Sequence, residues 1–201
     1  MKPFCLLVWV LFTLTSPLLL ADEMESWRQG LAGGKAVFHS SSPNGKWALF
    51  EINRYDIGLP TTDTALAVVT ANRSRLIGLL DCVTNHGTDL PYKSYLTTLW
   101  SSDSAYLALH DSTPKNSTLK IYRVTDVGLD QIKLPDLLIP ARAQFRLGEQ
   151  KISGSGQLPI AWSKADTLIV EVRISAHHSS YKTKFSLQLS DNGVVQVNPL
   201  P

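Results

Sequence analysis

The stretch SSPNGKWALF, residues 41–50, decides the fold because it recurs twice further along the chain. Aligned without gaps, it corresponds to WSSDSAYLAL at residues 100–109 and to WSKADTLIV at residues 162–170. Three residues then fall at equivalent places: Trp47, Tyr106 and Leu168. The spacings are 106 − 47 = 59 and 168 − 106 = 62 residues, so the sequence predicts three similar structural units.

Each repeated stretch places polar turn formers directly before an apolar strand. Pro43-Asn44-Gly45 shows this most clearly, because these residue types favour a tight reversal of the chain. Apolar and polar residues alternate in residues 118–124 and 184–190, as expected for half-buried strands. The sequence therefore predicts an all-β fold of three four-stranded antiparallel units, which span about residues 35–82, 96–134 and 159–198.

One segment between the second and third units departs from the β pattern. Asp136 is able to cap the start of a helix, and Pro140 is tolerated there only within a first turn. A short inserted helix is therefore predicted near residues 137–146. The glycines Gly154 and Gly156 then predict a flexible loop over residues 151–157.

The repeated residues resemble those of TolB-type β-propellers, whose repeats run tryptophan, serine, proline, aspartate, glycine, a basic residue, an aromatic and a short apolar strand. The first copy here lacks the tryptophan, the second lacks proline and glycine, and the third keeps Trp162, Ser163 and a displaced Asp166. The resemblance implies units related to propeller blades and no particular activity, because function resides in sites added to a fold. Propellers close with roughly four to eight blades. Three units therefore favour a compact three-sheet domain without a central channel, and the alternative is an assembly of several copies.

The beginning of the chain predicts a secretory signal peptide over residues 1–21. Lys2 supplies a short positive region, an apolar run follows from Cys5 to Leu14, and the small residue Ala21 precedes a group of acids. The apolar stretch is interrupted by Pro17 and is short for a membrane-spanning helix, which needs roughly 20 apolar residues. Residues 22–201 are then expected to form one β-repeat domain, periplasmic or extracellular, with no membrane attachment after cleavage.

Charge and cysteine content narrow the classes of function. Removal of residues 1–21 takes away Lys2 alone among charged side chains, which leaves 18 basic and 17 acidic residues, a formal charge of +1. No concentrated basic run is present, which argues against nucleic acid as a partner. Cys82 remains as a single cysteine, and it is predicted to be a small buried side chain. The alternative, a nucleophile, would require activation by a neighbour such as His86.

Two arrangements of residues could carry hydrolytic chemistry. His110-Asp111 follows an apolar strand and could join Ser102 or Ser112 in a nucleophilic set, although the chain lacks a Gly-x-Ser-x-Gly turn. The second is a pair of carboxylates from different units, Glu51 and Glu171. Serine, histidine and aspartate are common near strand ends, and nothing in the sequence sets the separation of the two glutamates, so no catalytic residue is assigned.

The aromatic residues divide into two groups. Trp100 and Trp162 precede equivalent turns and are predicted to fill the seams between neighbouring sheets. Trp27 lies near the expected mature N-terminus, where it is freer to face a ligand.

A binding face is expected on two unusually long connections, residues 55–63 and 176–182, which follow the strands after the repeated turns, because recognition usually falls on loops carried by a rigid scaffold. Adjacent histidines without further ligands do not make a metal site, so neither a metal nor a cofactor is expected. The sequence predicts a non-enzymatic, exported domain of the cell envelope that binds an unknown protein or small ligand. The alternatives are a hydrolase with a dispersed site and an incomplete propeller that functions only as a homo-oligomer. The candidate partner-binding residues are Tyr55, Asp56, His177, His178 and Tyr181.

Overall fold

The computed structural model describes residues 25–36, 41–53, 64–80, 95–112, 117–176, 179–191 and 193–201. The expected signal peptide and Cys82 lie outside these ranges and stay predictions. The same holds for four of the five candidate partner-binding residues, Tyr55, Asp56, His177 and His178.

The described strands form three four-stranded antiparallel sheets, each built from four consecutive strands. The predicted all-β fold is therefore confirmed. The first sheet contains β1 (Lys35–Ala36), β2 (Trp47–Asn53), β3 (Thr64–Thr70) and β4 (Leu76–Leu80). The second contains β5 (Tyr95–Trp100), β6 (Tyr106–Ser112), β7 (Ser117–Val124) and β8 (Leu129–Ile132). The third contains β9 (Ile152–Lys164), β10 (Thr167–Ala176), β11 (Ser179–Ser190) and β12 (Gly193–Leu200).

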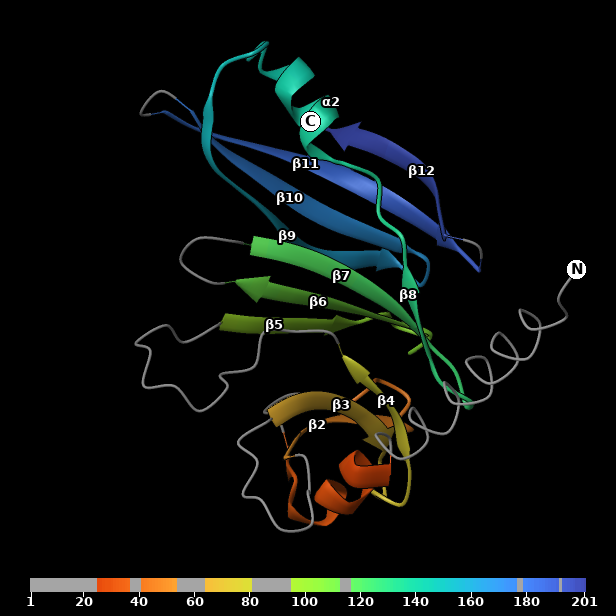
Figure 1. Ribbon diagram of the computed structural model, residues 1–201. Coiled ribbons are helices and arrows are strands. Elements are labelled where there is room, and N and C mark those ends of the chain that lie inside the picture. The colour runs from red at the N-terminus through yellow and green to blue at the C-terminus, as the bar shows by residue number, and fades with distance from the viewer. Residues whose placement is uncertain are drawn as a thin grey trace, which may run out of the picture.

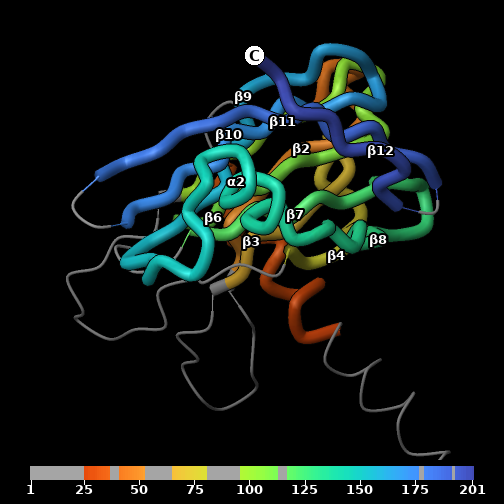
Figure 2. The backbone as a smooth tube through the Cα atoms, turned by 90° about the horizontal axis from the view of Figure 1, so that it is seen from above, coloured from red at the N-terminus to blue at the C-terminus, as the bar shows by residue number. Residues whose placement is uncertain are grey.

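The three sheets lie one above another, with the second sheet between the first and the third (Figure 1). Viewed from above, their strands overlie one another (Figure 2). Alternation along β6 explains the layering, since Leu107 and Leu109 face the first sheet while Tyr106 and Ala108 face the third. The middle sheet is therefore apolar on both faces, and two hydrophobic clusters hold the stack together.

Helical segments close the stack at two places. A helical turn at residues 25–30 and the 3-10 helix Leu31–Gly33 lie on the outer face of the first sheet. There Trp27, 7% exposed, packs with Ala48, Phe50 and Ile52. The expectation that Trp27 faces a ligand is therefore wrong, because the apolar outer face of the first sheet needs a cover.

The inserted helix is confirmed as α2 (Leu138–Gln144), near the predicted 137–146. Leu137 at its start and Ala141 within it are buried in the cluster between the second and third sheets.

The turns of the first two units repeat in atomic detail. In each, a serine hydroxyl accepts the backbone N–H five residues on, from Trp47 to Ser42 (3.0 Å) and from Tyr106 to Ser101 (2.9 Å). Gly45 has a φ of 68° and the equivalent Ser104 has 65°. The left-handed conformation that glycine accepts readily is thus kept where the sequence has serine.

The third turn corrects the gapless alignment by one residue. Backbone N–H groups of the following strand bond to the carbonyl of Lys46 in the first unit, Ala105 in the second and Asp166 in the third. The equivalent of Trp47 and Tyr106 is therefore Thr167, and Leu168 points to the opposite face. The third turn is one residue shorter than the other two, and the gapless alignment of the sequence did not reveal this difference.

Tryptophans fill both seams, as predicted, although they are half-buried. Trp162 stacks on Tyr106 of the second sheet, with ring centroids 5.9 Å apart and planes inclined by 20°. Trp100 packs against the cluster between the first and second sheets, which contains Trp47. Trp162 thus packs against the cluster that contains Tyr106, and Trp100 packs against the cluster that contains Trp47. In both cases the cluster contains the aromatic residue that follows the turn of the preceding unit.

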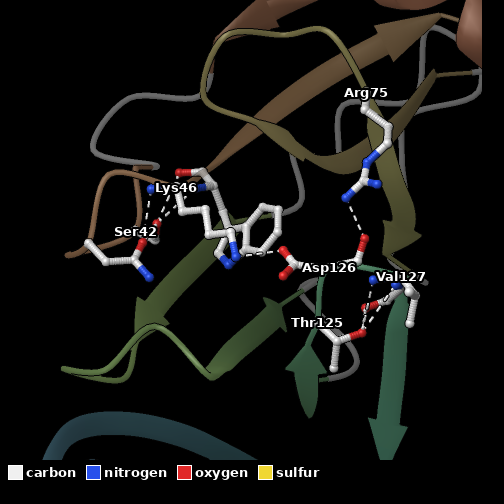
Figure 3. A network of polar contacts seen from close by, with 9 residues as sticks. Ser42, Lys46, Arg75, Thr125, Asp126 and Val127 are labelled. Carbon is white, nitrogen blue, oxygen red and sulfur yellow. Dashed lines mark hydrogen bonds and ion pairs between the residues drawn. The ribbon is translucent and has the colours of Figure 1, made fainter.

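Charged side chains at the turns also connect successive units. Lys46 Nζ of the first unit lies 2.6 Å from Asp126 Oδ1 in the β7–β8 turn, and Arg75 donates to the Asp126 carbonyl (Figure 3). Arg123 of the second unit reaches Asp191 in the equivalent β11–β12 turn, at 3.2 Å. These pairs are largely exposed, so each is expected to contribute little to the stability of the fold.

Two predicted loops are shorter than expected. Residues 151–157 are not a flexible loop, because β9 begins at Ile152 and pairs with the full length of β10. The loop predicted over residues 176–182 is reduced as well, since β10 ends at Ala176 and β11 begins at Ser179. The third sheet is consequently larger than the second.

Within the described ranges, none of the helices has the length and apolar character needed to cross a membrane.

Candidate functional site

The larger size of the third sheet leaves part of its inner face without a partner sheet. β12 has eight residues, whereas the equivalent strand β8 has four. At about 3.3 Å per residue, the second sheet is too short to cover the end of β11 and β12. Helix α2 lies over part of this overhang, beside the C-terminal end of β12 (Figure 1). A groove remains between the helix and the strand.

Contacts at the C-terminal end of α2 hold the helix against β11, and a local hydrogen bond caps its N-terminal end. At the N-terminal end, Asp136 Oδ1 accepts the N–H of Leu138 at 2.9 Å, which satisfies one of the free donors of the first turn. At the C-terminal end, Thr183 Oγ1 of β11 donates to Gln144 Oε1 at 2.6 Å. The rings of Phe145 and Tyr181 pack there with centroids 5.1 Å apart.

The groove has a volume of about 700 Å³ and an apolar lining. Phe185, only 1% exposed, lies in its floor, while Ile139, 67% exposed, forms the rim on the helix side. Seven of the nine lining residues are apolar, and three of these are prolines. The lining residues are Pro135, Asp136, Leu137, Ile139, Pro140, Gln144, Phe185, Val197 and Pro199.

A smaller cavity of about 170 Å³ adjoins the groove at Gln144, which lines both. It lies where β12 ends at Leu200 and is lined by Lys182, Lys184 and Glu171. Glu171 Oε1 accepts a hydrogen bond from Arg173 Nε at 2.6 Å. The apolar groove therefore has a basic end.

Among the sequence-predicted site residues, Tyr181 is the one that the structure describes. It lies in β11 opposite Ile174 and is half-buried against Phe145. Tyr181 therefore supports the C-terminal end of α2, and it does not line the groove. The groove itself was missed, because it is lined jointly by α2 and β12, which are distant in sequence. The one sequence feature that could have indicated the groove is Ile139, an apolar residue beside Pro140 in the amphipathic helical turn.

The proposed nucleophilic set around His110 is not assembled. His110 and Asp111 are consecutive in β6, so their side chains point to opposite faces of the sheet. His110 Nε2 instead lies 2.5 Å from Ser117 Oγ in β7, which is neither of the two serines considered. Ser117 lies diagonally across the β6–β7 pair, and strand register could have identified it.

Burial dominates the electrostatics of His110. Loss of solvent lowers the pKa of its imidazole below the ordinary value of 6.5, which Asp111 opposes and Arg173 reinforces. The side chain is 8% exposed. The neutral imidazole is therefore favoured, in a structural contact between β6 and β7.

The suggested carboxylate pair does not form. Glu51 lies in β2 of the first sheet and Glu171 in β10 of the third, and the second sheet separates them (Figure 1). A search of the described ranges finds no group of three or more His, Cys, Asp or Glu side chains placed to hold a metal ion.

Comparison with protein-family models and with curated proteins finds no significant match for this chain.

Proposed function

We propose that this protein is a non-enzymatic binding domain whose ligand occupies the groove between α2 and β12. The observation that carries the proposal is the groove itself, about 700 Å³ in volume and apolar in seven of its nine lining residues. Binding sites for small molecules have volumes of roughly 300–1,000 Å³ and combine an apolar lining with a few polar groups. Asp136 and Gln144 are those polar groups here.

The extent of the groove favours a small ligand over a folded partner. A standard protein–protein interface uses roughly 20–30 residues on each side. The groove offers nine. Its occupant is therefore a small apolar molecule or a single apolar chain of a larger one.

The outer faces of the first and third sheets support a protein that functions as a single chain. The outer face of the first sheet is apolar and is covered by the helical turn that carries Trp27. The outer face of the third sheet carries polar residues such as Arg173 and Gln188, both exposed. Terminal units of repeat proteins need such covered or polar outer faces. Homo-oligomerisation through further stacking is the less favoured alternative.

Export and ancestry belong to the same proposal. The expected signal peptide over residues 1–21 supports a periplasmic or extracellular domain of the cell envelope. The repeated turns at Ser42 and Ser101 support descent of the units from TolB-type blades. Three stacked sheets then replace a closed ring.

Titration of the purified domain with alkyl ligands, followed by calorimetry and amide chemical shifts, tests the groove. Val197→Thr, which puts a hydroxyl into the lining, should weaken binding roughly tenfold, as expected for burial of an unsatisfied hydroxyl. Val195→Thr is the matched control, because Val195 lies in the same strand, is 62% exposed and is outside the lining. Equal binding by both variants would place the ligand elsewhere. Turnover of generic ester, phosphoester or glycoside substrates, lost in His110→Ala, would instead support the hydrolase alternative.

A further inference from the structure

We propose, on the basis of the binding function above, that the ligand is a single-chain amphiphile with an anionic headgroup. Its apolar chain lies in the groove between α2 and β12, and its headgroup is held by Lys182 and Lys184.

The two lysines belong to one face of one strand. Side chains two residues apart in a strand point to the same side, so Lys182 and Lys184 lie on the outer face of β11, whereas Thr183 and Phe185 lie on the inner face, toward α2. The bond from Thr183 Oγ1 to Gln144 Oε1 fixes the place where the cavity at the lysines meets the apolar groove. β12 ends at Leu200 opposite Lys184, which leaves the edge of β11 open, and the cavity there is lined by Thr183 of the inner face as well as by both lysines. A headgroup at the lysines is therefore connected around this edge to a chain in the groove.

The local balance of charge attracts an anion. The charged side chains on this face of β10 and β11 are three cations, Arg173, Lys182 and Lys184, and one anion, Glu171. Their net charge is 3 − 1 = +2. Glu171 is engaged by Arg173 at 2.6 Å. Over the described ranges, neither Lys182 nor Lys184 forms an ion pair with a carboxylate. Ammonium groups on flexible stems suit a carboxylate, sulfate or phosphate headgroup.

The opposite end of the groove gives the ligand a direction. Asp136 lines the groove at the N-terminal end of α2, and Gln144 lines it at the C-terminal end. The seven-residue helix separates them by roughly 10 Å at 1.5 Å per residue. An anionic headgroup is repelled by Asp136 and attracted by the lysines, so the chain runs from the lysine end toward Asp136.

The edge of β12 favours an alkyl chain over an extended peptide. A peptide strand would bind by pairing with backbone groups along the free edge of β12. Pro199 has no N–H to offer, and a register shift in the pairing with β11 interrupts the strand near Val195. An alkyl chain needs no such hydrogen bonds and uses the apolar lining alone.

Calorimetric titration with octanoate, decanoate and dodecanoate below their micellar concentrations tests the proposal, with the corresponding alcohols as uncharged probes. Each added methylene should tighten binding roughly fourfold, the equivalent of about 0.8 kcal/mol. Carboxylates should bind at least tenfold more tightly than the alcohols at low salt, and added salt should reduce the difference.

Charge-removing variants separate the headgroup site from the groove. Lys182→Gln with Lys184→Gln should weaken carboxylate binding about tenfold and leave alcohol binding unchanged. Lys35→Gln with Lys164→Gln is the matched control, since it removes the same charge from exposed positions outside the groove and its basic end. Both double variants should unfold at the same denaturant concentration as the parent protein.

Three results would overturn the inference. Equal affinity for alcohols and carboxylates would show that the lysines do not bind the headgroup, and the apolar groove alone would then be the binding site. Binding of an acidic apolar peptide but of no alkyl carboxylate would replace the amphiphile with a peptide ligand. Failure of every alkyl probe and peptide to bind would overturn the proposed function together with the inference.

Discussion

Trp162 of the third sheet stacks on Tyr106 of the second, and its indole Nε1 donates a hydrogen bond to the carbonyl of Leu99 at 3.1 Å. The ring contact and the hydrogen bond both cross the seam, so one side chain joins the edge of one unit to the next. The position occurs again in Trp100, one unit earlier, at the seam between the first and second sheets. The stack is therefore held by tryptophans at repeated positions in addition to its two hydrophobic clusters.

Removing either seam tryptophan should destabilise the fold. Trp100→Ala and Trp162→Ala should each lower the free energy of unfolding by about 3 kcal/mol, the lower end for large core aromatics, because both are half-buried. Trp162→Phe should cost about 1 kcal/mol by losing the bond to Leu99 while it keeps the stack. Denaturant titration measures each change. Val127→Ala is the control, since Val127 is 95% exposed and its loss should cost under about 0.5 kcal/mol.

The first repeated turn depends on a left-handed residue at Gly45. Its φ is 68°, and an added Cβ would meet open space, so any loss of stability in Gly45→Ala reports backbone strain alone. The variant should lose about 1 kcal/mol of unfolding free energy. Gly128→Ala is the matched control, because that turn glycine also faces open space and has an ordinary φ. If thermal or denaturant unfolding shows equal effects for the two variants, the turn does not have the described conformation.

The local parts of the fold could be predicted from sequence, since turn chemistry and strand periodicity act over a few residues. The alternating residues 118–124 and 184–190 lie in strands β7 and β11, as the pattern predicts. Errors arose where a distant partner decides the structure. Gly154 and Gly156 read as a loop, yet the long β10 pairs with them.

The candidate groove could not be predicted for the same reason. Nothing in residues 135–144 indicates that α2 and β12 will together line a groove that includes Phe185 and Val197. The predicted binding loops were chosen from their length, and one of them is largely strand, as the place of Tyr181 in β11 shows. A preformed groove follows from the relative sizes of two sheets, which is a tertiary property.

The buried His110 predicts a loss of stability in mild acid. Burial lowers its pKa in the folded protein below 6.5, whereas the unfolded chain keeps the ordinary value. Between these two values the unfolded state binds more protons, so the free energy of unfolding should fall as the pH decreases below about 6.5. Its contribution should be complete above that pH and should stop changing below the folded-state pKa.

Denaturant midpoints from pH 5 to 8 measure this effect in the parent and in His110→Gln. The variant should show a shallower decline, because it lacks the histidine whose pKa burial lowers, while the other four histidines are the same in both proteins. Identical pH profiles would mean that His110 is accessible to water and free to protonate in the folded state.

The close approach of β9 to β7 gives the sharpest test of the third sheet. A Cβ built on Gly156 would lie 2.9 Å from Ser117 Oγ and 3.0 Å from its Cβ, and Ser117 is itself held by His110. Gly156→Ala should therefore lower the unfolding free energy by about 1–3 kcal/mol through overpacking. Gly154→Ala, two residues earlier in the same strand, meets open space and should be neutral or slightly stabilising. Adding Ser117→Gly should recover part of the loss in Gly156→Ala, which a double-mutant cycle measures as a coupling. If both alanine variants behave alike and show no coupling to Ser117, residues 151–157 are a loop that does not pack on the second sheet.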